Sequence, residues 1–202
     1  MPIIHNLPAP SLPVLSIAPL TPEAFAPFGT VVITPQTGGI TVNQGSATKH
    51  PRISPLHHSY PASSPPATTN MNLFQCRPRS LPLSGIFNCQ ILERHPYTTQ
   101  TFIPMAAGEE GYIVIVAPTG TDGWPVLGNM KAFKAEKEMA VTYGKGTWHA
   151  PMVVLEKETK FVVVNGENGV GREDCEEVTI GGEGVKVKVR EGNFGLWERA
   201  KL

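Results

Sequence analysis

Short apolar runs separated by turn residues cover most of this chain. Glycine and proline contribute 20 residues each. Because both residue types interrupt regular structure, they leave segments of the length that strands, rather than helices, tolerate. The pattern therefore predicts a mainly β fold with few short helices. Strands are expected at 30–34, 71–76, 86–95, 99–104, 111–117, 130–134, 139–143, 148–156, 159–164, 175–180 and 185–190.

The best helix candidate spans residues 21–26. Thr21 can cap its first turn, Pro22 suits the first helical position, and Glu23 lies near the positive end of the helix dipole. Gly29 follows closely and is expected to end the segment. The prediction is a helix of one or two turns.

The length of the chain predicts one domain spanning residues 1–202, because all-β barrels often use about 200 residues as a single unit. Its core is expected at about 17–180. Residues 35–70 are rich in Ser, Thr and Pro and have little to bury, which predicts a mobile loop. In the terminal segment 181–202, alternation of Val with Lys and Arg predicts an extra strand, with one apolar and one basic face.

The charge balance argues against nucleic acid or membrane partners. The chain has 17 basic and 17 acidic residues with no long block of either sign. No apolar run approaches the roughly 18 residues that span a bilayer, and the Pro-rich start lacks the features of a secretory signal. Three cysteines without metal-finger spacing do not indicate a disulfide framework. The expected partner is a small molecule.

Two segments place ligand-type side chains in strand-like surroundings. Glu93 and His95 alternate in the first segment, so their side chains should point to the same face of a strand. Gln100 follows, and His149 begins an apolar strand in the second segment. If these strands face one interior, a pocket holds two imidazoles, a carboxylate and an amide, which a divalent cation accepts. Each could instead be a hydrogen-bonded core residue.

Further candidates surround this set. Tyr143 is a candidate for acid-base catalysis, and Lys131, Lys49 or an arginine of Cys76–Arg79, with Arg77 preferred, could pair with a substrate carboxylate. Arg94 should point away from Glu93, which favours a structural ion pair. The neighbouring Trp148 is more typical of a core residue than of a substrate platform.

The spacing of the polar positions resembles a degenerate cupin motif, with Glu93-x-His95, Gln100, Gly108 and Gly146-x-x-His149 in order. Two of the four ligands of that motif are kept in kind, and two are replaced by other oxygen donors. A longer series of segments resembles the ureidoglycolate lyases. These segments are Thr21–Phe25 with Phe28-Gly29, Asn43-Gln44-Gly45, Leu92–Pro96, Thr99–Pro104, Ala132-Phe133, Tyr143, Gly146–His149, Phe161–Val164 and Cys175–Val178.

The resemblance implies a cupin-type β-barrel, or jelly roll, that is usually a homodimer. It implies cleavage of ureidoglycolate to glyoxylate and urea in allantoin and purine catabolism, with no organic cofactor. Glu93, His95, Gln100 and His149 would hold a divalent metal ion, or His149 or Glu93 would act directly as a base. Gln100 could instead bind the ureido group.

Asn43 and Lys49 are similar to a family segment near the pocket, so the resemblance makes them substrate-binding candidates. Two other functions stay open. One is an ammonia-releasing ureide amidohydrolase of cupin fold, and the other is a non-catalytic cupin that binds a small carboxylate.

The last three residues, Ala200-Lys201-Leu202, are a close variant of the C-terminal peroxisomal targeting signal Ser-Lys-Leu. We therefore expect recognition by a peroxisomal import receptor, with a cytoplasmic location as the alternative.

Overall fold

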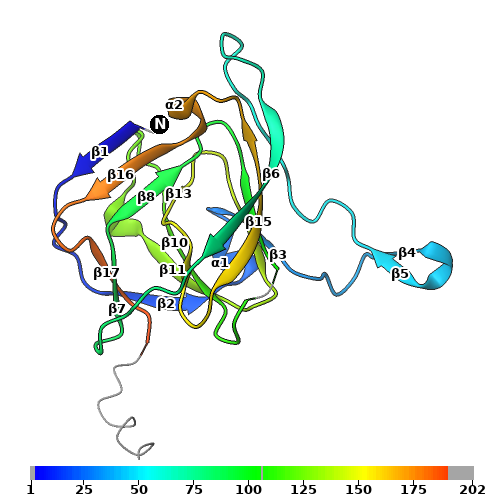
Figure 1. Cartoon of the computed structure of the whole chain (residues 1–202), viewed down its shortest axis with the longest axis horizontal. Helices are drawn as coiled ribbons and strands as arrows, with labels where there is room; N and C mark the ends of the chain where they lie inside the picture. Colours follow the sequence, from blue (N-terminus) through cyan, green and yellow to red (C-terminus); the bar gives the residue numbers. More distant parts are fainter. Residues whose placement is uncertain (1–2, 106, 191–202) are drawn as a thin grey trace, which may run out of the picture.

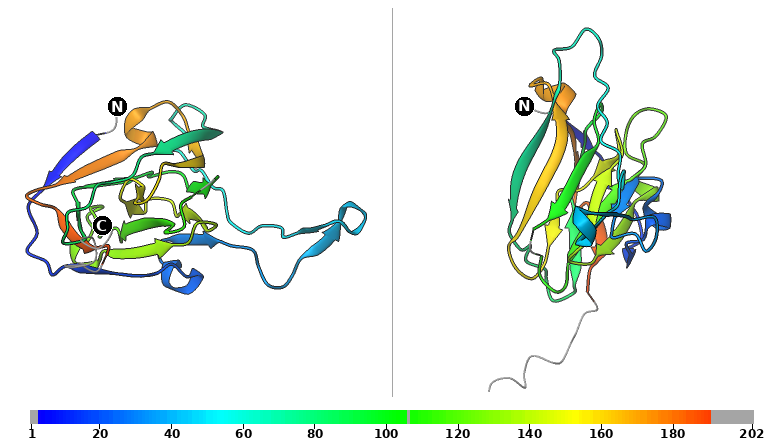
Figure 2. Two further views of the ribbon diagram at one scale, coloured as in Figure 1. Left: turned by 60° about the horizontal axis from the view of Figure 1, so that its bottom comes forward. Right: turned by 90° about the vertical axis from the view of Figure 1, so that its right-hand side faces the viewer.

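Two curved sheets hold most of the strands of this chain (Figure 1). The computed structural model describes residues 3–105 and 107–190, so Ala200-Lys201-Leu202 lies outside the described residues. The sheets curl toward each other and enclose a common interior, as Figure 2 shows from two further sides. The predicted mainly β, cupin-like fold is confirmed.

The larger sheet forms one side of the enclosure. Its strands run in the order β1 (Ile3–Leu7), β16 (Glu176–Ile180), β8 (Ile91–Arg94), β13 (Trp148–His149), β10 (Tyr112–Ala117), β11 (Lys131–Ala135), β2 (Leu15–Pro19), β17 (Val185–Lys188) and β7 (Ile86–Cys89), and β14 (Val153–Val154) pairs with β10.

The smaller sheet forms the opposite side. Its order is β3 (Gly29–Val32), β12 (Ala140–Tyr143), β9 (Gln100–Pro104), β15 (Thr159–Glu167) and β6 (Thr68–Cys76). A separate hairpin of β4 (Ile40–Val42) and β5 (Ala47–Lys49) projects from the body (Figure 1).

The helices are short. The predicted one is α1 (Pro22–Phe25), where the Thr21 hydroxyl accepts a hydrogen bond from the Ala24 amide at 3.2 Å. A second helix, α2 (Gly171–Asp174), was not predicted, and single 3-10 turns occur at Asn43–Gly45 and Leu127–Asn129. Neither α-helix of the described residues approaches the length of a membrane span.

The predicted strands differ from the structure mainly in two ways: two long strands are interrupted, and the N-terminal segment contains strands that were not predicted. The stretch 86–95 is interrupted at Gln90, and 148–156 is split around Pro151, which has no amide hydrogen for a ladder. The Pro-rich start also forms strands that were not predicted. There β1 pairs in parallel with β16, and β2 pairs in parallel with β11 and β17. These pairings are non-local, so the local composition conceals them.

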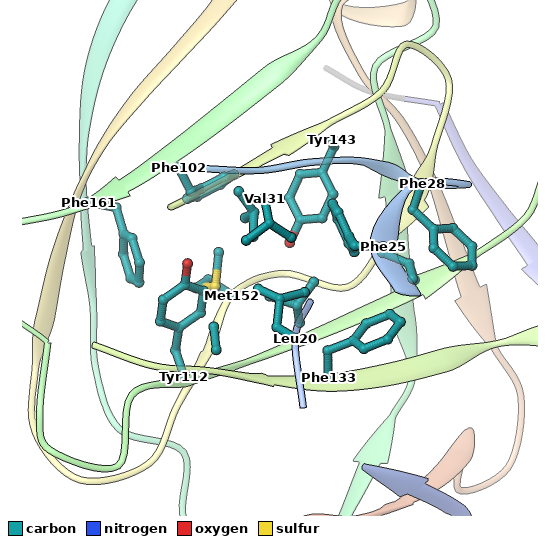
Figure 3. Packing of buried hydrophobic residues seen from close by; sticks show 14 of the residues in the cluster. Leu20, Phe25, Phe28, Val31, Phe102, Tyr112, Phe133, Tyr143, Met152 and Phe161 are labelled. Atoms are coloured by element: carbon teal, nitrogen blue, oxygen red, sulfur yellow. The ribbon is translucent and has the colours of Figure 1, made fainter. Parts of the chain in front are cut away.

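Aromatic side chains fill the space between the two sheets (Figure 3). Phe161 of β15 is fully buried and meets Phe102 and Tyr112 edge to face, at ring-centroid distances of 5.8 and 5.2 Å. Edge-to-face contacts of this kind add to the stabilisation from burial alone. The interior is therefore well packed on the side away from the polar candidates.

The predictions for Arg94 and Trp148 are both confirmed. Arg94 forms an ion pair with Glu176 at 2.6 Å, and its guanidinium lies 4.7 Å from the centroid of a Trp148 ring. Trp148 is fully buried in a second apolar cluster on the other side of the larger sheet. These two residues tie β8, β13 and β16 together next to the candidate site.

Replacing Phe161 with Ala should lower the free energy of unfolding by about 3–5 kcal/mol, because it leaves a cavity among packed aromatic rings. Lys160→Ala, at the exposed neighbouring position, serves as the control and should change stability by less than about 0.5 kcal/mol. Chemical denaturation checks both values, and equal effects of the two variants would contradict the assignment of the core.

Candidate functional site

Three strands from the two sheets bring the candidate ligands together. Glu93 on β8 and His149 on β13 are directly paired in register, and His95 follows β8 by one residue. Potential ligand atoms of these three residues all lie within 4.8 Å of one another, so the group could hold a metal ion. Gln100 of β9 joins them from the smaller sheet, with its Oε1 atom 3.2 Å from His149 Nε2. The site thus bridges the two sheets.

Backbone carbonyls fix the orientation of both imidazoles. His95 Nδ1 lies 2.6 Å from the carbonyl oxygen of Asp174, and His149 Nδ1 lies 2.9 Å from that of Thr147. Because a carbonyl only accepts hydrogen bonds, each Nδ1 must donate. Each Nε2 is then directed to the centre of the group. This is how second-shell contacts set histidine tautomers in metal sites.

The centre of the group is rich in acceptors and poor in donors. His95 Nε2 is buried and has no hydrogen-bond partner among the described residues. His149 Nε2 lies 3.6 Å from Glu93 Oε1 and faces Gln100 Oε1. Buried lone pairs that face one another are unfavourable unless a proton or a cation lies between them. The residues therefore fit a bound divalent cation.

The ionisation of the cluster follows from its burial and its charges. Burial alone would raise the pKa of Glu93, but the neighbouring imidazoles of His149 and His95 lower it below its usual value overall. Burial and the nearby His149 lower the pKa of His95, against the opposing effect of its bond to Asp174. Both shifts favour a carboxylate next to a neutral imidazole at pH 7.

Tyr143 contributes its ring to this site. The ring stacks on His149 with centroids 3.9 Å apart and planes 9° from parallel. Its hydroxyl is buried without a hydrogen-bond partner among the described residues, and burial raises its pKa well above the usual value. Figure 3 shows Tyr143 within the aromatic core. The structure therefore supports a positioning role for this ring more directly than proton transfer by its hydroxyl.

A cleft of about 540 Å³ leads to the group from outside. Glu93 lines this cleft and is the most exposed member of the cluster, with 22% of its side chain accessible compared with 1% for His149. Arg77 and Arg79 follow β6 and line the same cleft, and Phe74 and Phe102 supply apolar walls. A small anion would thus meet two guanidinium groups beside a carboxylate.

Three predicted substrate-binding residues do not line this cleft. Lys131 is exposed at the start of β11, in the larger sheet. Asn43 and Lys49 lie on the β4–β5 hairpin, which stands away from the body (Figure 1). Their proposed contacts with substrate stay predictions, because the hairpin of a single chain does not place them beside Glu93.

A set of hydrogen bonds around Asp174, which we call the latch, supports the contact between Asp174 and His95. The sequence did not predict it. The carboxylate of Asp174 accepts hydrogen bonds from the Tyr60 hydroxyl at 2.8 Å and from the amides of Asn168 and Gly169 at 2.8 and 2.9 Å. The backbone carbonyl of the same Asp174 orients His95. Tyr60 comes from the stretch expected to be mobile, and nothing in the local sequence pairs it with a residue 114 positions away.

Comparison with known proteins agrees with this geometry. The family model of ureidoglycolate lyase matches residues 12–188. The ureidoglycolate lyase of Schizosaccharomyces pombe (strain 972 / ATCC 24843) is 42% identical over 165 residues, which cover 78% of this chain and 86% of that protein. This chain belongs to the ureidoglycolate lyase family.

Bacterial members of the ureidoglycolate lyase family are also similar. The proteins of that name from Stutzerimonas stutzeri (strain A1501) and Pseudomonas putida (strain W619) are 34% and 33% identical over 163 residues. In both cases 81% of this chain is covered, with 88% and 89% of the relatives. The resemblance predicted from the sequence is therefore confirmed. The matched span also includes β17, which had been expected to lie beyond the core.

Tyr60→Phe should destabilise the fold by about 1–2 kcal/mol, because it removes the one hydroxyl proton that the Asp174 carboxylate and the Gly166 carbonyl share as acceptors. It should also speed amide exchange at Asn168 and Gly169, whose partner carboxylate loses an anchor. Tyr97→Phe is the matched control, since its ring packs 5.4 Å from that of Tyr60. Hydrogen exchange measured by NMR tests this, and equal exchange rates in both variants would contradict the latch.

Proposed function

We propose that this chain cleaves ureidoglycolate to glyoxylate and urea. The observation that carries the proposal is the buried group of Glu93, His95, Gln100 and His149 at a cleft lined by two arginines, in a member of the ureidoglycolate lyase family. Such a group can move protons, and such a cleft can bind a small carboxylate.

The substrate defines what the site must do. The central carbon of ureidoglycolate carries a carboxylate, a hydroxyl and a ureido nitrogen. Cleavage breaks the carbon–nitrogen bond, while the hydroxyl loses its proton and becomes the carbonyl of glyoxylate. The leaving nitrogen must gain a proton to depart as urea. The reaction is therefore an elimination driven by general acid-base catalysis.

The residues divide these tasks by their positions. Arg77 or Arg79 pairs with the substrate carboxylate at the cleft, which orients the central carbon. Glu93 is the most accessible acceptor of the cluster and takes the hydroxyl proton. When no metal ion is bound, His149 Nε2, which lies 3.6 Å from Glu93 Oε1, relays this proton to the departing nitrogen, and Gln100 hydrogen-bonds the ureido group.

A divalent cation would be held by Glu93, His95, His149 and Gln100. When bound there, it would lower the pKa of the substrate hydroxyl and so ease removal of the proton. The orphaned Nε2 atom of His95 supports this part of the proposal, because a metal ligand needs a free, oriented lone pair.

Purified protein mixed with ureidoglycolate should yield urea and glyoxylate in equal amounts, without free ammonia. Enzymatic assays of the three products check this directly. Ammonia as the main nitrogen product would assign the chain to the amidohydrolases instead. Binding of substrate with no product would assign it to the non-catalytic carboxylate-binding cupins.

His95→Ala and His149→Ala should each lower kcat/KM by at least about a hundredfold, the scale of losing an acid-base group or a metal ligand. Both variants should also lose bound divalent metal by elemental analysis. His5→Ala, outside the cluster, is the control and should keep both properties. A wild type that is free of metal and fully active after chelation would support direct acid-base catalysis.

Arg77→Ala should raise KM about tenfold or more with a smaller change in kcat, because it removes a charge-assisted contact with the substrate carboxylate. Arg79→Ala tests the second guanidinium in the same way. Steady-state kinetics separate the two constants. If both variants keep the wild-type KM, the carboxylate does not bind at this end of the cleft.

A further inference from the structure

A second carboxylate lies beside the candidate ligands. Glu177 of β16 is in register with Glu93 of β8, which in turn is in register with His149 of β13. These three strands lie side by side in the larger sheet (Figure 1). Residues paired in this way project from the same face of a sheet, on strands about 4.8 Å apart. The three side chains therefore form one row on the inner face of the larger sheet.

The neighbours of Glu177 along β16 point to the opposite face. Val178 is fully buried in the apolar cluster on the outer side of the larger sheet, which also contains Trp148. Glu176 forms the ion pair with Arg94, whose guanidinium lies over the Trp148 ring. Because side chains alternate along a strand, Glu177 faces the interior.

The Cys175 thiol lies near the carboxylates of both Glu93 and Glu177. Cys175 has an extended backbone and comes two residues before Glu177, so the two side chains share a face. Burial, and then nearby carboxylates beginning with Glu93 and Glu177, raise the pKa of this half-buried thiol to about 12. The two carboxylates therefore contribute to one negative potential on the inner face.

Two carboxylates in this arrangement need a positive partner. Like charges that lie directly opposite each other on neighbouring strands destabilise a sheet. His149 Nε2 lies 3.6 Å from Glu93 Oε1, but none of the ion pairs formed by the described residues includes Glu177. Glu177 is also half-buried, so water only partly solvates its charge. A cation held beside the pair would remove the repulsion.

The four candidate ligands supply only one negative charge. Glu93 is a carboxylate, whereas Gln100 is an amide and the two imidazoles direct Nε2 lone pairs at the centre. A divalent cation would keep one uncompensated charge, in a site where His149 is 1% and His95 9% exposed. Burying an uncompensated charge is unfavourable. His95 Nε2, which has no hydrogen-bond partner among the described residues, indicates independently that a positive group belongs here.

We propose that Glu177 is an outer carboxylate of the cation site, which offsets the second positive charge of a divalent cation without binding it. The ligand atoms that lie within 4.8 Å of one another come from Glu93, His95 and His149, and Glu177 is outside this group. Its charge acts through space and increases the affinity of the site. This inference rests on the cation proposed above and is independent of the substrate.

Calorimetric titration of the metal-stripped full chain with Co²⁺ alone tests the proposal. Glu177→Gln keeps the size of the side chain and removes its charge, and it should raise the Kd for Co²⁺ at least about tenfold, the scale of losing an outer partner of a metal site. Glu177→Asp keeps the charge and should restore most of the affinity. Glu183→Gln is the control, because it removes the same charge from a side chain that is 67% accessible. It should bind Co²⁺ as the wild type does.

The absorption spectrum of bound Co²⁺ distinguishes an outer carboxylate from a ligand. The spectrum depends on the number and type of the ligands and on their geometry. Glu177→Gln saturated with Co²⁺ should keep the wild-type spectrum, because the four ligands remain. A changed spectrum would overturn the placement of Glu177 outside the ligand group.

Metal-free protein gives a result that a purely structural role of Glu177 would not give. Glu177→Gln removes the repulsion between positions 93 and 177, so its Tm without metal should equal or exceed that of the wild type. If Glu177 instead made a stabilising contact, the metal-free variant would melt several degrees lower, and the proposal would be wrong.

These measurements use no substrate, so their outcome does not depend on which products the chain forms. A wild type that binds no Co²⁺ overturns both the cation site and the role of Glu177. Equal affinity for Co²⁺ in the wild type and in Glu177→Gln overturns the role of Glu177 alone.

Discussion

The structure depends on a group of buried hydrogen-bond acceptors that is stable only with a proton or a cation between its members. The side chains of Glu93, Gln100 and His149 direct lone pairs at one another, and His95 adds an Nε2 atom that has no hydrogen-bond partner in the described part of the chain. Backbone carbonyls hold the two imidazoles in place, and strand pairing sets Glu93 directly opposite His149. The interior therefore keeps a place for a proton or a cation, at a cost that the apolar core must offset.

The interior has an aromatic half and a polar half, and they differ in what holds them together. Aromatic packing around Phe161 and Phe102 contributes stability to one half. In the polar half, hydrogen bonds and ion pairs from neighbouring segments support the site residues. Arg94 joins β8 to β16, and Asp174 holds His95 while being held by Tyr60. A change far from the cleft, such as loss of the Tyr60 hydroxyl, can thus alter the orientation of an imidazole.

The two faces of β6 have different surroundings. Arg77 and Arg79 approach Glu93 from the end of β6, while the same strand turns Met71 and Leu73 to the outside. Alternation along one strand therefore directs one face of β6 into the interior, beside the cleft, and leaves the other face exposed.

The sequence by itself determined the class, the strands of the core and the convergence of Glu93, His95 and His149. These follow from local alternation and from motif spacing, which act within a few residues. Only the tertiary structure decided three other features. These are the parallel pairing of β1 with β16 and of β2 with β11, the hydrogen bond from Tyr60 to Asp174, and the absence of Lys131 and Lys49 from the lining of the cleft. Those features depend on contacts between segments far apart in the chain, and no local pattern encodes such contacts.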